Sequence, residues 1–352
     1  MCADRDLSVT SAPQRILEIA FAFRKSKVLF AAVELGVFAA LSKGPLELAA
    51  LAASIGLNER AARDFLDALV ALRLLERDQR NWYASAPDAA LYLDPASQHC
   101  IGAVIVYQDR LVYPTWARLS DGLRDGKPKG GPFAAGGFDA YYANACASGL
   151  FLDAMAAGSV APARALASRF PWERYRTFVD IGTARGTVPV ELVERHPHLS
   201  GAGFDLPSLE AAFFSHASSH GVADRLSYQP GDFLVDALPP ADVLLMGRIL
   251  HDWGIDTRRM LIAKAYATLP DHGALVVWDA LIDDDRHDSA GLLSSLNMLL
   301  QTDAGAEYTA GECIAWMREA GFARVCTMPL SGPYTAVVAD KRPTGEIGTF
   351  GR

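Results

Sequence analysis

Residues 177–186, Thr-Phe-Val-Asp-Ile-Gly-Thr-Ala-Arg-Gly, constrain the fold more than any other stretch of this chain. The first five residues are mostly apolar, as in a buried parallel strand, and apolar residues recur at helical spacing over 187–196. Between them, Gly182 and Gly186 lack a Cβ atom, so the turn can bend sharply and present N–H groups to a ligand at a helix N-terminus. The stretch predicts a nucleotide-type site, although the same glycine spacing also serves close packing of helix on strand.

Acidic residues end the next predicted strands. Asp205 ends the strand predicted over 201–206 and follows Asp180 by 25 residues. This separation is close to the interval of about 20 residues at which an acidic residue meets a ribose in nucleotide-binding βαβ units. A third strand over 225–229 leads to Gly231-Asp232-Phe233, where the Asp can hydrogen-bond an exocyclic amine and the ring can cover a base. An ordinary turn is the alternative interpretation of this last segment.

These motifs resemble those of class I S-adenosylmethionine (SAM)-dependent methyltransferases, within the plant-type and bacterial small-molecule O-methyltransferase family. The resemblance rests on Asp180-Ile181-Gly182-Thr183-Ala184-Arg185-Gly186, Phe204-Asp205-Leu206-Pro207, Gly231-Asp232-Phe233 and Leu250-His251-Asp252-Trp253, and it spans nearly the whole chain. It implies an α/β fold, with a Rossmann-like seven-stranded methyltransferase sheet after a mainly helical winged-helix dimerisation domain. The family usually has glycine where Ala184 stands, so this loop must accommodate a methyl group close to the cofactor.

The resemblance also implies which residues hold SAM. Asp205 is expected at the ribose hydroxyls, and Asp232 and Phe233 at the adenine. Arg248 is expected near the polar end of the cofactor, and Trp253 beside its ring. The complete expected set is Asp180, Gly182, Gly186, Asp205, Leu206, Gly231, Asp232, Phe233, Arg248 and Trp253.

Bulk properties restrict the class of protein. With 352 residues, 51% hydrophobic and 21% charged, the chain can bury a sizeable core. Its net charge of −8 argues against a nucleic-acid partner, because phosphate binding needs a basic surface. The five cysteines show no CxxC spacing, and we found neither a signal peptide nor an 18-residue apolar run, so we expect a cytoplasmic protein that spans no membrane.

The N-terminal part has a winged-helix pattern. Helices are predicted over 13–40, 46–55 and 58–72, with Asn58 as an N-cap, and a short hairpin follows over 74–83. Winged helices often bind DNA, which makes a transcriptional regulator the second class of function. The candidate recognition helix, however, interleaves its arginines with acidic residues, so no cationic face develops.

In the resembling family this module dimerises instead. The apolar positions of the first helices exceed what one small core needs, so we expect a homodimer in which Phe21, Val28, Leu29 and Phe30 are buried against a second copy.

Residues 98–168 are predicted to be helical except for a loop over 125–137. The stretch is rich in aromatic residues, which in the resembling family form the roof of the acceptor pocket; interhelical core is the alternative. Met155 and Arg110 are candidate acceptor contacts, Arg110 for a carboxylate, although a solvated arginine is an equal alternative. We divide the chain into an acceptor-pocket and dimerisation domain (1–168), a SAM-binding domain (169–342) and a C-terminal tail (343–352).

The SAM-binding domain is predicted to alternate strand and helix as a doubly wound sheet, closed by a hairpin over 324–340. Ligands bind at the carboxyl ends of such strands, and the strand over 241–246 delivers His251 to that edge. A neutral imidazole can accept a hydroxyl proton near neutral pH, and the resemblance makes His251 the general base, with Asp279 and Glu307 holding its ring. Plant members of the family commonly have Glu at the position of Asp279. The Asp side chain is one methylene shorter and reaches less far toward the ring.

The acceptor is not identified by the sequence. Asn297 and Met298 are expected to face it, with helix packing and core as the alternatives. We expect methylation of a hydroxyl on a small aromatic natural product without a metal, but carbon and nitrogen acceptors stay open. In the main alternative, His251, Asp252 and Asp303 bind a metal that holds a 2-oxo acid for methylation on carbon.

Overall fold

The computed structural model describes residues 13–342, apart from the side chains of residues 145–147. Contacts within the chain divide it into two compact units, residues 1–109 and 110–352. The tail expected over 343–352 lies outside the described residues. By their contacts, residues 110–168 belong to the unit that contains the seven-stranded sheet. The domain boundary expected at 168 stays a prediction.

The first unit is a small winged-helix module. Its helices are α1 (Gln14–Phe21), α2 (Phe23–Glu34), α3 (Val37–Ala40), α4 (Leu48–Ser54), α5 (Glu59–Ala71), α6 (Pro87–Leu93) and α7 (Gly102–Tyr107). Strands β1 (Leu46–Glu47), β2 (Leu75–Arg77) and β3 (Trp82–Ser85) form an antiparallel sheet in the order β1-β3-β2. Asn58 caps α5 as expected, because its side chain accepts a hydrogen bond from the N–H of Arg60 at 3.0 Å. The helix expected over 46–55 instead begins at Leu48, after the short strand β1.

The second unit starts with helices that precede the sheet. A π-helical turn η1 (Gln108–Val112) is followed by α8 (Tyr113–Trp116), α9 (Leu119–Asp125), α10 (Gly131–Ala134), α11 (Phe138–Tyr142) and α12 (Ala145–Arg169). The loop expected over 125–137 therefore contains the short helix α10.

Helix α12 is long and apolar enough over Ser148–Arg169 to cross a membrane, which the sequence analysis did not anticipate. Within this unit it packs on α13, and its Arg164 forms an ion pair with Glu191 of α13 at 3.0 Å. Leu152, Ala163, Leu166 and Ala167 on one side of α12 lie in the hydrophobic core of this unit.

The rest of the unit alternates strands and helices. The strands are β4 (Thr177–Ile181), β5 (Ser200–Asp205), β6 (Leu226–Pro230), β7 (Val243–Gly247), β8 (Ala274–Asp279), β9 (Arg324–Pro329) and β10 (Thr335–Asp340). The helices are α13 (Thr187–Arg195), α14 (Glu210–Ser219), α15 (Ile255–Thr268), α16 (Ser289–Gln301) and α17 (Ala310–Glu319), with 3₁₀ turns η2 (Trp172–Arg174), η3 (Pro207–Leu209), η4 (Ala223–Arg225) and η5 (Leu250–Asp252).

The seven strands form one sheet in the order β6-β5-β4-β7-β8-β10-β9. All pairs are parallel except those of β10, which runs antiparallel to β8 and β9. The order reverses between β4 and β7, where the crossover connections leave opposite faces of the sheet. The expected seven-stranded Rossmann-like sheet and its closing hairpin are confirmed.

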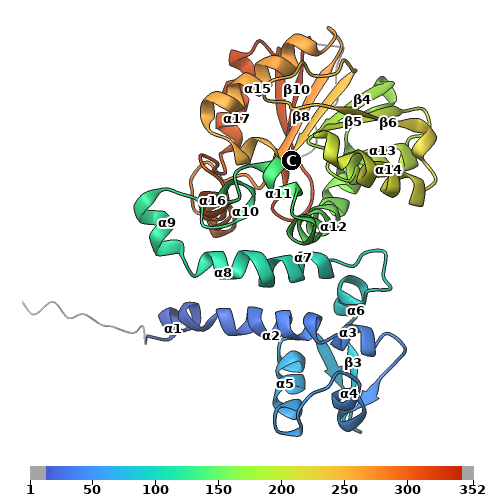
Figure 1. Cartoon of the computed structure of the whole chain (residues 1–352), viewed down its shortest axis with the longest axis vertical. Helices are drawn as coiled ribbons and strands as arrows, with labels where there is room; N and C mark the ends of the chain where they lie inside the picture. The colour runs from blue at the N-terminus through green and yellow to red at the C-terminus, as the bar shows by residue number, and fades with distance from the viewer. Residues whose placement is uncertain (1–12, 343–352) are drawn as a thin grey trace, which may run out of the picture. The chain divides into compact units, whose positions relative to one another are not determined.

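Successive side chains of the central strands face two separate cores. In β7, Val243 and Leu245 pack with α13 and α14, whereas Leu244 and Met246 pack with α15 and α17. Figure 1 shows these helix pairs on the two sides of the sheet. Because both faces are covered, the free edge for a ligand is at the carboxyl ends of the strands.

Candidate active site

The turn after β4 is bent by two glycines with different roles. Gly182 has φ +70°, and a Cβ atom there would lie 2.2 Å from Cδ1 of Ile249. Gly186 has φ +78°, and a Cβ atom there would lie 2.5 Å from Cε2 of Phe213. Only glycine fits either position. Gly182 lines the cavity described below, whereas Gly186 does not line it and packs on Phe213, so its expected cofactor contact stays a prediction.

Ala184 occupies the centre of this turn in a left-handed conformation, with φ +50°. An L-residue there costs roughly 1–2 kcal/mol, which explains the preference for glycine in the resembling proteins. The N–H of Ala184 donates a 2.8 Å hydrogen bond to Oδ2 of Asp205. This bond compensates part of the strain and holds the turn against the end of β5.

Asp205 is a buried carboxylate with capacity for two more donors. It is 8% exposed, and its second oxygen, Oδ1, accepts the N–H of Leu206 at 2.8 Å. Each oxygen keeps one further lone pair, which suits the paired hydroxyls of a ribose. Burial raises the pKa of Asp205 to about 6, although the two N–H bonds lower it. At the end of β4, burial raises the pKa of Asp180 to about 7.

Several hydrogen bonds hold the loop after β6. Asp232 accepts the N–H of Leu234 at 2.8 Å, and its own N–H donates to Asp236 at 2.8 Å. Lys264 of α15 donates to the carbonyl of Phe233 at 2.7 Å. The ring of Phe233 meets Trp253 edge to face, with 5.9 Å between centroids. Nothing in the sequence pattern of α15 distinguishes Lys264 from a solvated lysine.

These turns line a cavity of about 520 Å³ at the carboxyl ends of β4, β5 and β7. The walls include all the expected cofactor residues other than Gly186, namely Asp180, Gly182, Asp205, Leu206, Gly231, Asp232, Phe233, Arg248 and Trp253. The indole N–H of Trp253 is buried and has no hydrogen-bond partner among the described residues. A glycine turn, a buried carboxylate and an unpaired donor fit a nucleoside such as that of SAM.

Arg248 lies at the same edge in a strained conformation, with φ +60°. Its N–H donates to the carbonyl of Trp278 at 2.8 Å, and its guanidinium lies 2.7 Å from the sulfur of Met155. The preceding residue, Gly247, leaves no room for a Cβ atom, which would lie 1.9 Å from Cζ2 of Trp278. Backbone strain of this kind gathers at functional sites.

The side of the cavity facing α10 to α12 is aromatic. Phe138, Tyr142 and Phe151 line it together with Met155, at the place where the family resemblance implied aromatic residues. Phe133 of α10 also lines it and packs edge to face on Trp253, with 5.4 Å between centroids. Phe133 was not among the residues predicted to line the site, because the glycine and proline around it indicated only a loop.

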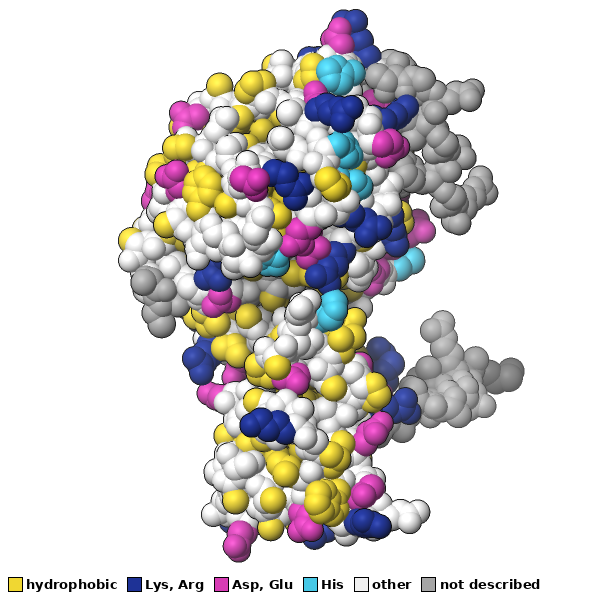
Figure 2. All heavy atoms as spheres, turned by 90° about the vertical axis from the view of Figure 1, so that its right-hand side faces the viewer, with side chains coloured by type: hydrophobic (Ala, Val, Ile, Leu, Met, Phe, Trp, Pro, Cys, Tyr) yellow, Lys and Arg dark blue, Asp and Glu magenta, His cyan; other side chains and the backbone are white. Residues whose placement is uncertain are grey.

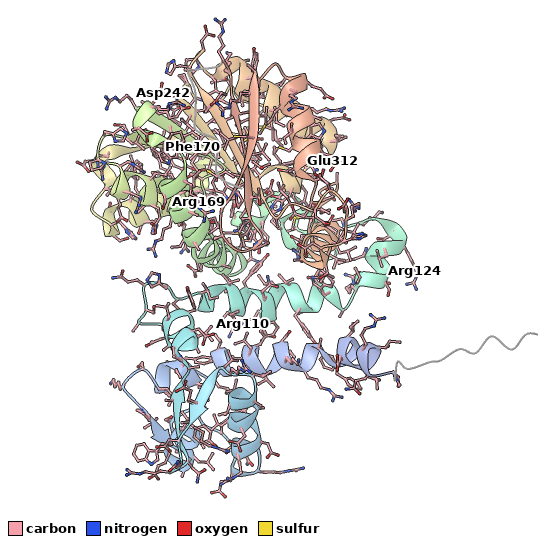
Figure 3. The ribbon with its side chains drawn as sticks, turned by 180° about the vertical axis from the view of Figure 1, so that it is seen from behind. Arg110, Arg124, Arg169, Phe170, Asp242 and Glu312 are labelled. Atoms are coloured by element: carbon pink, nitrogen blue, oxygen red, sulfur yellow. The ribbon has the colours of Figure 1, made fainter. Side chains whose placement is uncertain are left out.

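Three expected acceptor residues do not line this cavity. Arg110 is exposed on η1, at the label in Figure 3. Asn297 accepts a 3.0 Å hydrogen bond from the indole of Trp116, and Met298 is buried on the same helix, α16. These positions agree with the alternative interpretations of a surface arginine, a packing amide and a core methionine.

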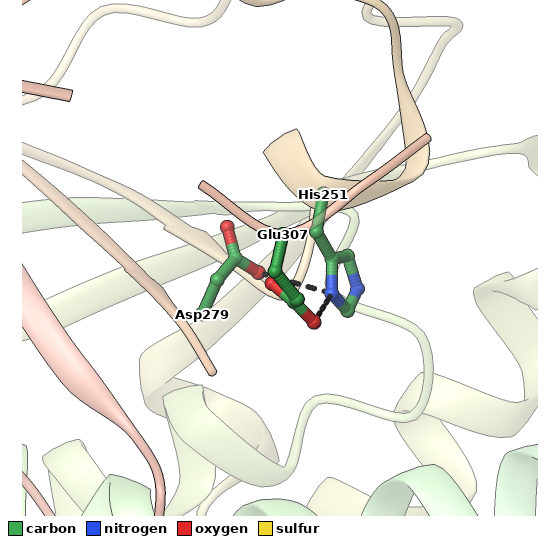
Figure 4. A group of neighbouring side chains, drawn as sticks. All are labelled: His251, Asp279 and Glu307. Atoms are coloured by element: carbon green, nitrogen blue, oxygen red, sulfur yellow. Dashed lines mark hydrogen bonds and ion pairs between the residues drawn. The ribbon is translucent and has the colours of Figure 1, made fainter. Parts of the chain in front are cut away.

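His251 lies between carboxylates from three other positions. Figure 4 shows the ring with its Nδ1 toward Asp279 and Glu307. The distance from Nδ1 to Oε1 of Glu307 is 2.9 Å, whereas Oδ1 of Asp279 is 3.6 Å away, which agrees with the shorter reach of Asp. Nε2 lies 3.7 Å from Oδ1 of Asp252. With a carboxylate at Nδ1, that nitrogen carries the proton, and Nε2 is the acceptor in the neutral ring.

The carboxylates around His251 are themselves anchored. The hydroxyl of Ser294 donates to Glu307 at 2.8 Å, and the hydroxyl of Tyr308 donates to Asp279 at 2.5 Å. Burial alone lowers the pKa of His251, but the charges of Glu307, Asp279 and Asp252 outweigh it and raise the pKa to about 10. Burial raises the pKa of Asp279 to about 7. His251 is thus an imidazolium held by carboxylates at neutral pH. It is 8% exposed and does not itself line the cavity, whereas its neighbours Asp252 and Trp253 do.

The metal ligands considered from the sequence are not brought together as a set. Asp252 and Asp303 both line the cavity, but Asp303 does not join His251 in a cluster of potential ligands. Among the described residues, the one cluster with all ligand atoms within 4.8 Å of one another is His251, Asp279 and Glu307. The sequence alternative of His251, Asp252 and Asp303 therefore has no support in the geometry.

The sheet order and the cavity at its switch point define a Rossmann-like enzyme that binds a nucleoside cofactor. Residues 116–323 match the O-methyltransferase domain model, and residues 17–95 match the O-methyltransferase dimerisation domain model. The chain belongs to this O-methyltransferase family, and it is a SAM-dependent methyltransferase.

Similar proteins cover nearly the whole chain. It is 43% identical over 330 residues to the tetracenomycin polyketide synthesis 8-O-methyl transferase TcmO of Streptomyces glaucescens, covering 94% of this chain and 97% of that one. It is 33% identical to the N,N-dimethyltransferase OxyT of Streptomyces rimosus, covering 90% and 92%. The structure of human N-acetylserotonin methyltransferase in complex with SAM superposes with a TM-score of 0.85 at 29% identity, covering 96% and 99%.

Proposed function

We propose that this enzyme transfers a methyl group to a hydroxyl of a planar aromatic natural product, with His251 as the general base. The observation that carries the proposal is the 2.9 Å contact between Glu307 and Nδ1 of His251, which directly precedes Asp252 and Trp253 of the cavity wall. The names of the 8-O-methyl transferase TcmO and of a 3-hydroxy-5-methyl-1-naphthoate 3-O-methyltransferase at 32% identity support an aromatic hydroxyl as the acceptor.

The chain contributes proton transfer and positioning. Bound SAM supplies an electrophilic sulfonium methyl group. Asp205, Asp232 and Phe233 hold the nucleoside, and the aromatic wall orients a flat acceptor so that its hydroxyl oxygen meets that methyl group. Nε2 of His251 takes the hydroxyl proton, and Glu307 and Asp279 stabilise the imidazolium that forms. Because these carboxylates raise the pKa of His251, only the minor neutral form of the ring can act as a base at neutral pH.

Substitution of His251 tests this role. We expect His251→Ala to lower turnover by roughly 10² to 10⁴ while S-adenosylhomocysteine affinity stays near that of the wild type. Turnover of both proteins is measured with SAM and a hydroxylated polycyclic aromatic, before and after treatment with a chelator. Wild-type turnover in the variant would refute the role of His251, and chelator-sensitive turnover would make His251 a metal ligand instead.

We also propose a homodimer formed through the first unit. Helix α1 has no buried residue, and Ile16, Ile19 and Phe21 on it are 65%, 67% and 44% exposed. Of the other residues expected in the interface, Val28, Leu29 and Phe30 are half-buried. A second copy packed on these helices would cover these apolar side chains, and the match to a dimerisation domain supports that partner. Light scattering should give about twice 37.9 kDa, and a mass of one chain at micromolar concentration would contradict the dimer. For location, we propose the cytoplasm.

A further inference from the structure

Arg258 of α15 is a buried cation with no role in the expected site. It is 5% exposed, and no carboxylate of the described residues forms an ion pair with it. Arginine is almost never buried to this extent unless its donors are satisfied. The neighbouring Arg259, in contrast, is exposed and pairs with Glu319 at 3.2 Å.

The guanidinium of Arg258 bonds to backbone carbonyls of two different loops. Its Nε donates to the carbonyl of Leu250 at 2.9 Å and to that of Trp253 at 2.7 Å. Its Nη2 donates to the carbonyl of Ala306. Leu250 directly precedes His251, and Ala306 directly precedes Glu307. One planar fork therefore joins the loop that carries the imidazole to the loop that carries its carboxylate partner.

Aromatic rings fix the plane of this guanidinium. Its central carbon lies 4.9 Å from the ring centroid of Tyr308 and 5.6 Å from that of Trp316. The hydroxyl of Tyr308 donates to Asp279, the third member of the cluster around His251. Arg258 thus contacts the loops of His251 and Glu307 directly and Asp279 only through Tyr308, without touching the imidazole itself.

The two loops also approach each other directly. The N–H of Ala306 donates to the carbonyl of His251 at 2.9 Å. At Gly305, a Cβ atom would lie 2.4 Å from that same carbonyl oxygen, so only glycine permits this separation. The distance between His251 and Glu307 therefore depends on the backbone spacing that Arg258 clamps.

We propose that Arg258 is a positioning residue for the reaction: it holds the loops of His251 and Glu307 at the separation that keeps the imidazole paired and aimed. The inference rests on the proposed role of His251 as the base. Lysine cannot replace this function, because its single ammonium lacks the planar fork that reaches both loops.

The expected signature is a change in turnover and in its pH dependence. The charged and titratable groups facing His251 are Asp252 of its own turn, Asp279 of β8 and Glu307 before α17, with Tyr308 on Asp279 and Arg248 near Asp252. If Glu307 moves away from Nδ1, the imidazolium loses its nearest partner and its pKa falls. The acidic limb of the kcat profile then moves to lower pH.

The experiment compares Arg258→Lys with Arg259→Lys, which changes an adjacent exposed arginine in the same way. We expect Arg258→Lys to lower kcat by roughly 10- to 100-fold, as a misplacement of about 1 Å does, with the acidic limb displaced to lower pH. The KM for SAM and the S-adenosylhomocysteine affinity should stay near those of the wild type. Arg259→Lys should match the wild type in every measurement.

A second variant tests the same loop spacing if Arg258→Lys does not fold. Gly305→Ala introduces the methyl group that collides with the carbonyl of His251, and it should give the same loss of kcat and the same displaced limb. Wild-type kcat and an unmoved limb in either folded variant would overturn the inference. A loss of cofactor affinity in proportion to kcat would also overturn it, because it indicates general unfolding. Retained turnover in His251→Ala would instead refute the proposed function.

Discussion

Asp205→Asn is the substitution whose effect on cofactor binding can be worked out most fully. Both carboxylate oxygens already accept a backbone N–H at 2.8 Å, from Ala184 and from Leu206. An asparagine has one oxygen and one NH₂ group, so its NH₂ must face one of these two donors. One backbone N–H and one ribose hydroxyl therefore lose their acceptor.

The two losses appear in different measurements. The unpaired N–H is present with and without cofactor, so it lowers the free energy of unfolding by about 1–3 kcal/mol and largely cancels in binding. The missing charge-assisted bond to the ribose costs about 1.5–3 kcal/mol of binding, which is roughly a 10- to 150-fold rise in Kd. Protonation has the same effect as the substitution, because the pKa of Asp205 is about 6 before binding. Wild-type affinity should then fall as the pH drops below about 6, and that part of the dependence should vanish in Asp205→Asn.

Calorimetry with S-adenosylhomocysteine between about pH 5 and 8 measures the rise in Kd and its pH dependence. Thermal melting measures the loss of stability. Asp242→Asn is the matched control. Asp242 also accepts two backbone N–H groups, from Arg176 and Thr177 at 2.8 and 3.0 Å, but both reach the same oxygen, Oδ2, and Oδ1 lies 2.9 Å from Nε2 of His272. Asp242 lies at the amino end of β7 and is labelled in Figure 3. The amide oxygen of an asparagine can keep both of these N–H bonds, so the control removes a partly buried negative charge beside His272 and should keep its affinity. Unchanged affinity in Asp205→Asn, or an equal loss in Asp242→Asn, would show that the ribose is not bound at Asp205.

Other predictions concern His251 and the turn after β4. Because its pKa of about 10 lies above the ordinary 6.5, protonated His251 contributes stability that is fully present below pH 6.5 and lost as the pH rises through 10, and turnover should rise over the same interval as the base becomes neutral. Glu307→Gln removes the nearest charge, so the acidic limb of its kcat profile should move to lower pH, and an unmoved limb would contradict the pairing. Ala184→Gly removes strain of roughly 1–2 kcal/mol at φ +50° and adds about 0.4–1 kcal/mol of unfolded-state entropy, so thermal melting should show stability unchanged or raised by up to about 1.5 kcal/mol. A loss of more than about 1 kcal/mol in that variant would mean that the methyl group makes packing contacts instead.

Much of the sheet domain was predictable because its signals are local. Apolar runs bounded by glycine and acidic residues located the strands, and the motif at Asp180 to Gly186 located the turn. The carboxyl-end rule then brought Asp205, Asp232 and His251 to one edge. The surface residues could not be assigned roles in the same way. Figure 2 shows basic and acidic side chains interspersed on one face, and such mixtures carry no ligand signal in the sequence.

The remaining site residues could not be predicted because their roles depend on long-range packing. Asn297 and Met298 share a helix that the sequence aimed at the acceptor, but a bond from Trp116 fixes the amide elsewhere. Arg258 and Lys264 read as ordinary polar positions of α15, and only the fold places their donors on carbonyls of the His251 and Phe233 loops. The same limit applies to Gly186, since its φ and its packing against Phe213 are not visible in a motif.

The most direct test of the account is the position of the transferred methyl group. The purified enzyme is supplied with SAM carrying a ¹³C methyl group and with a polycyclic aromatic that offers hydroxyl, amino and ring-carbon positions, and the product is examined by NMR. We predict that the label appears on an aromatic oxygen in the wild type and is lost in His251→Ala. Label on nitrogen or on carbon, or equal labelling of oxygen by both proteins, would contradict O-methylation with His251 as the base.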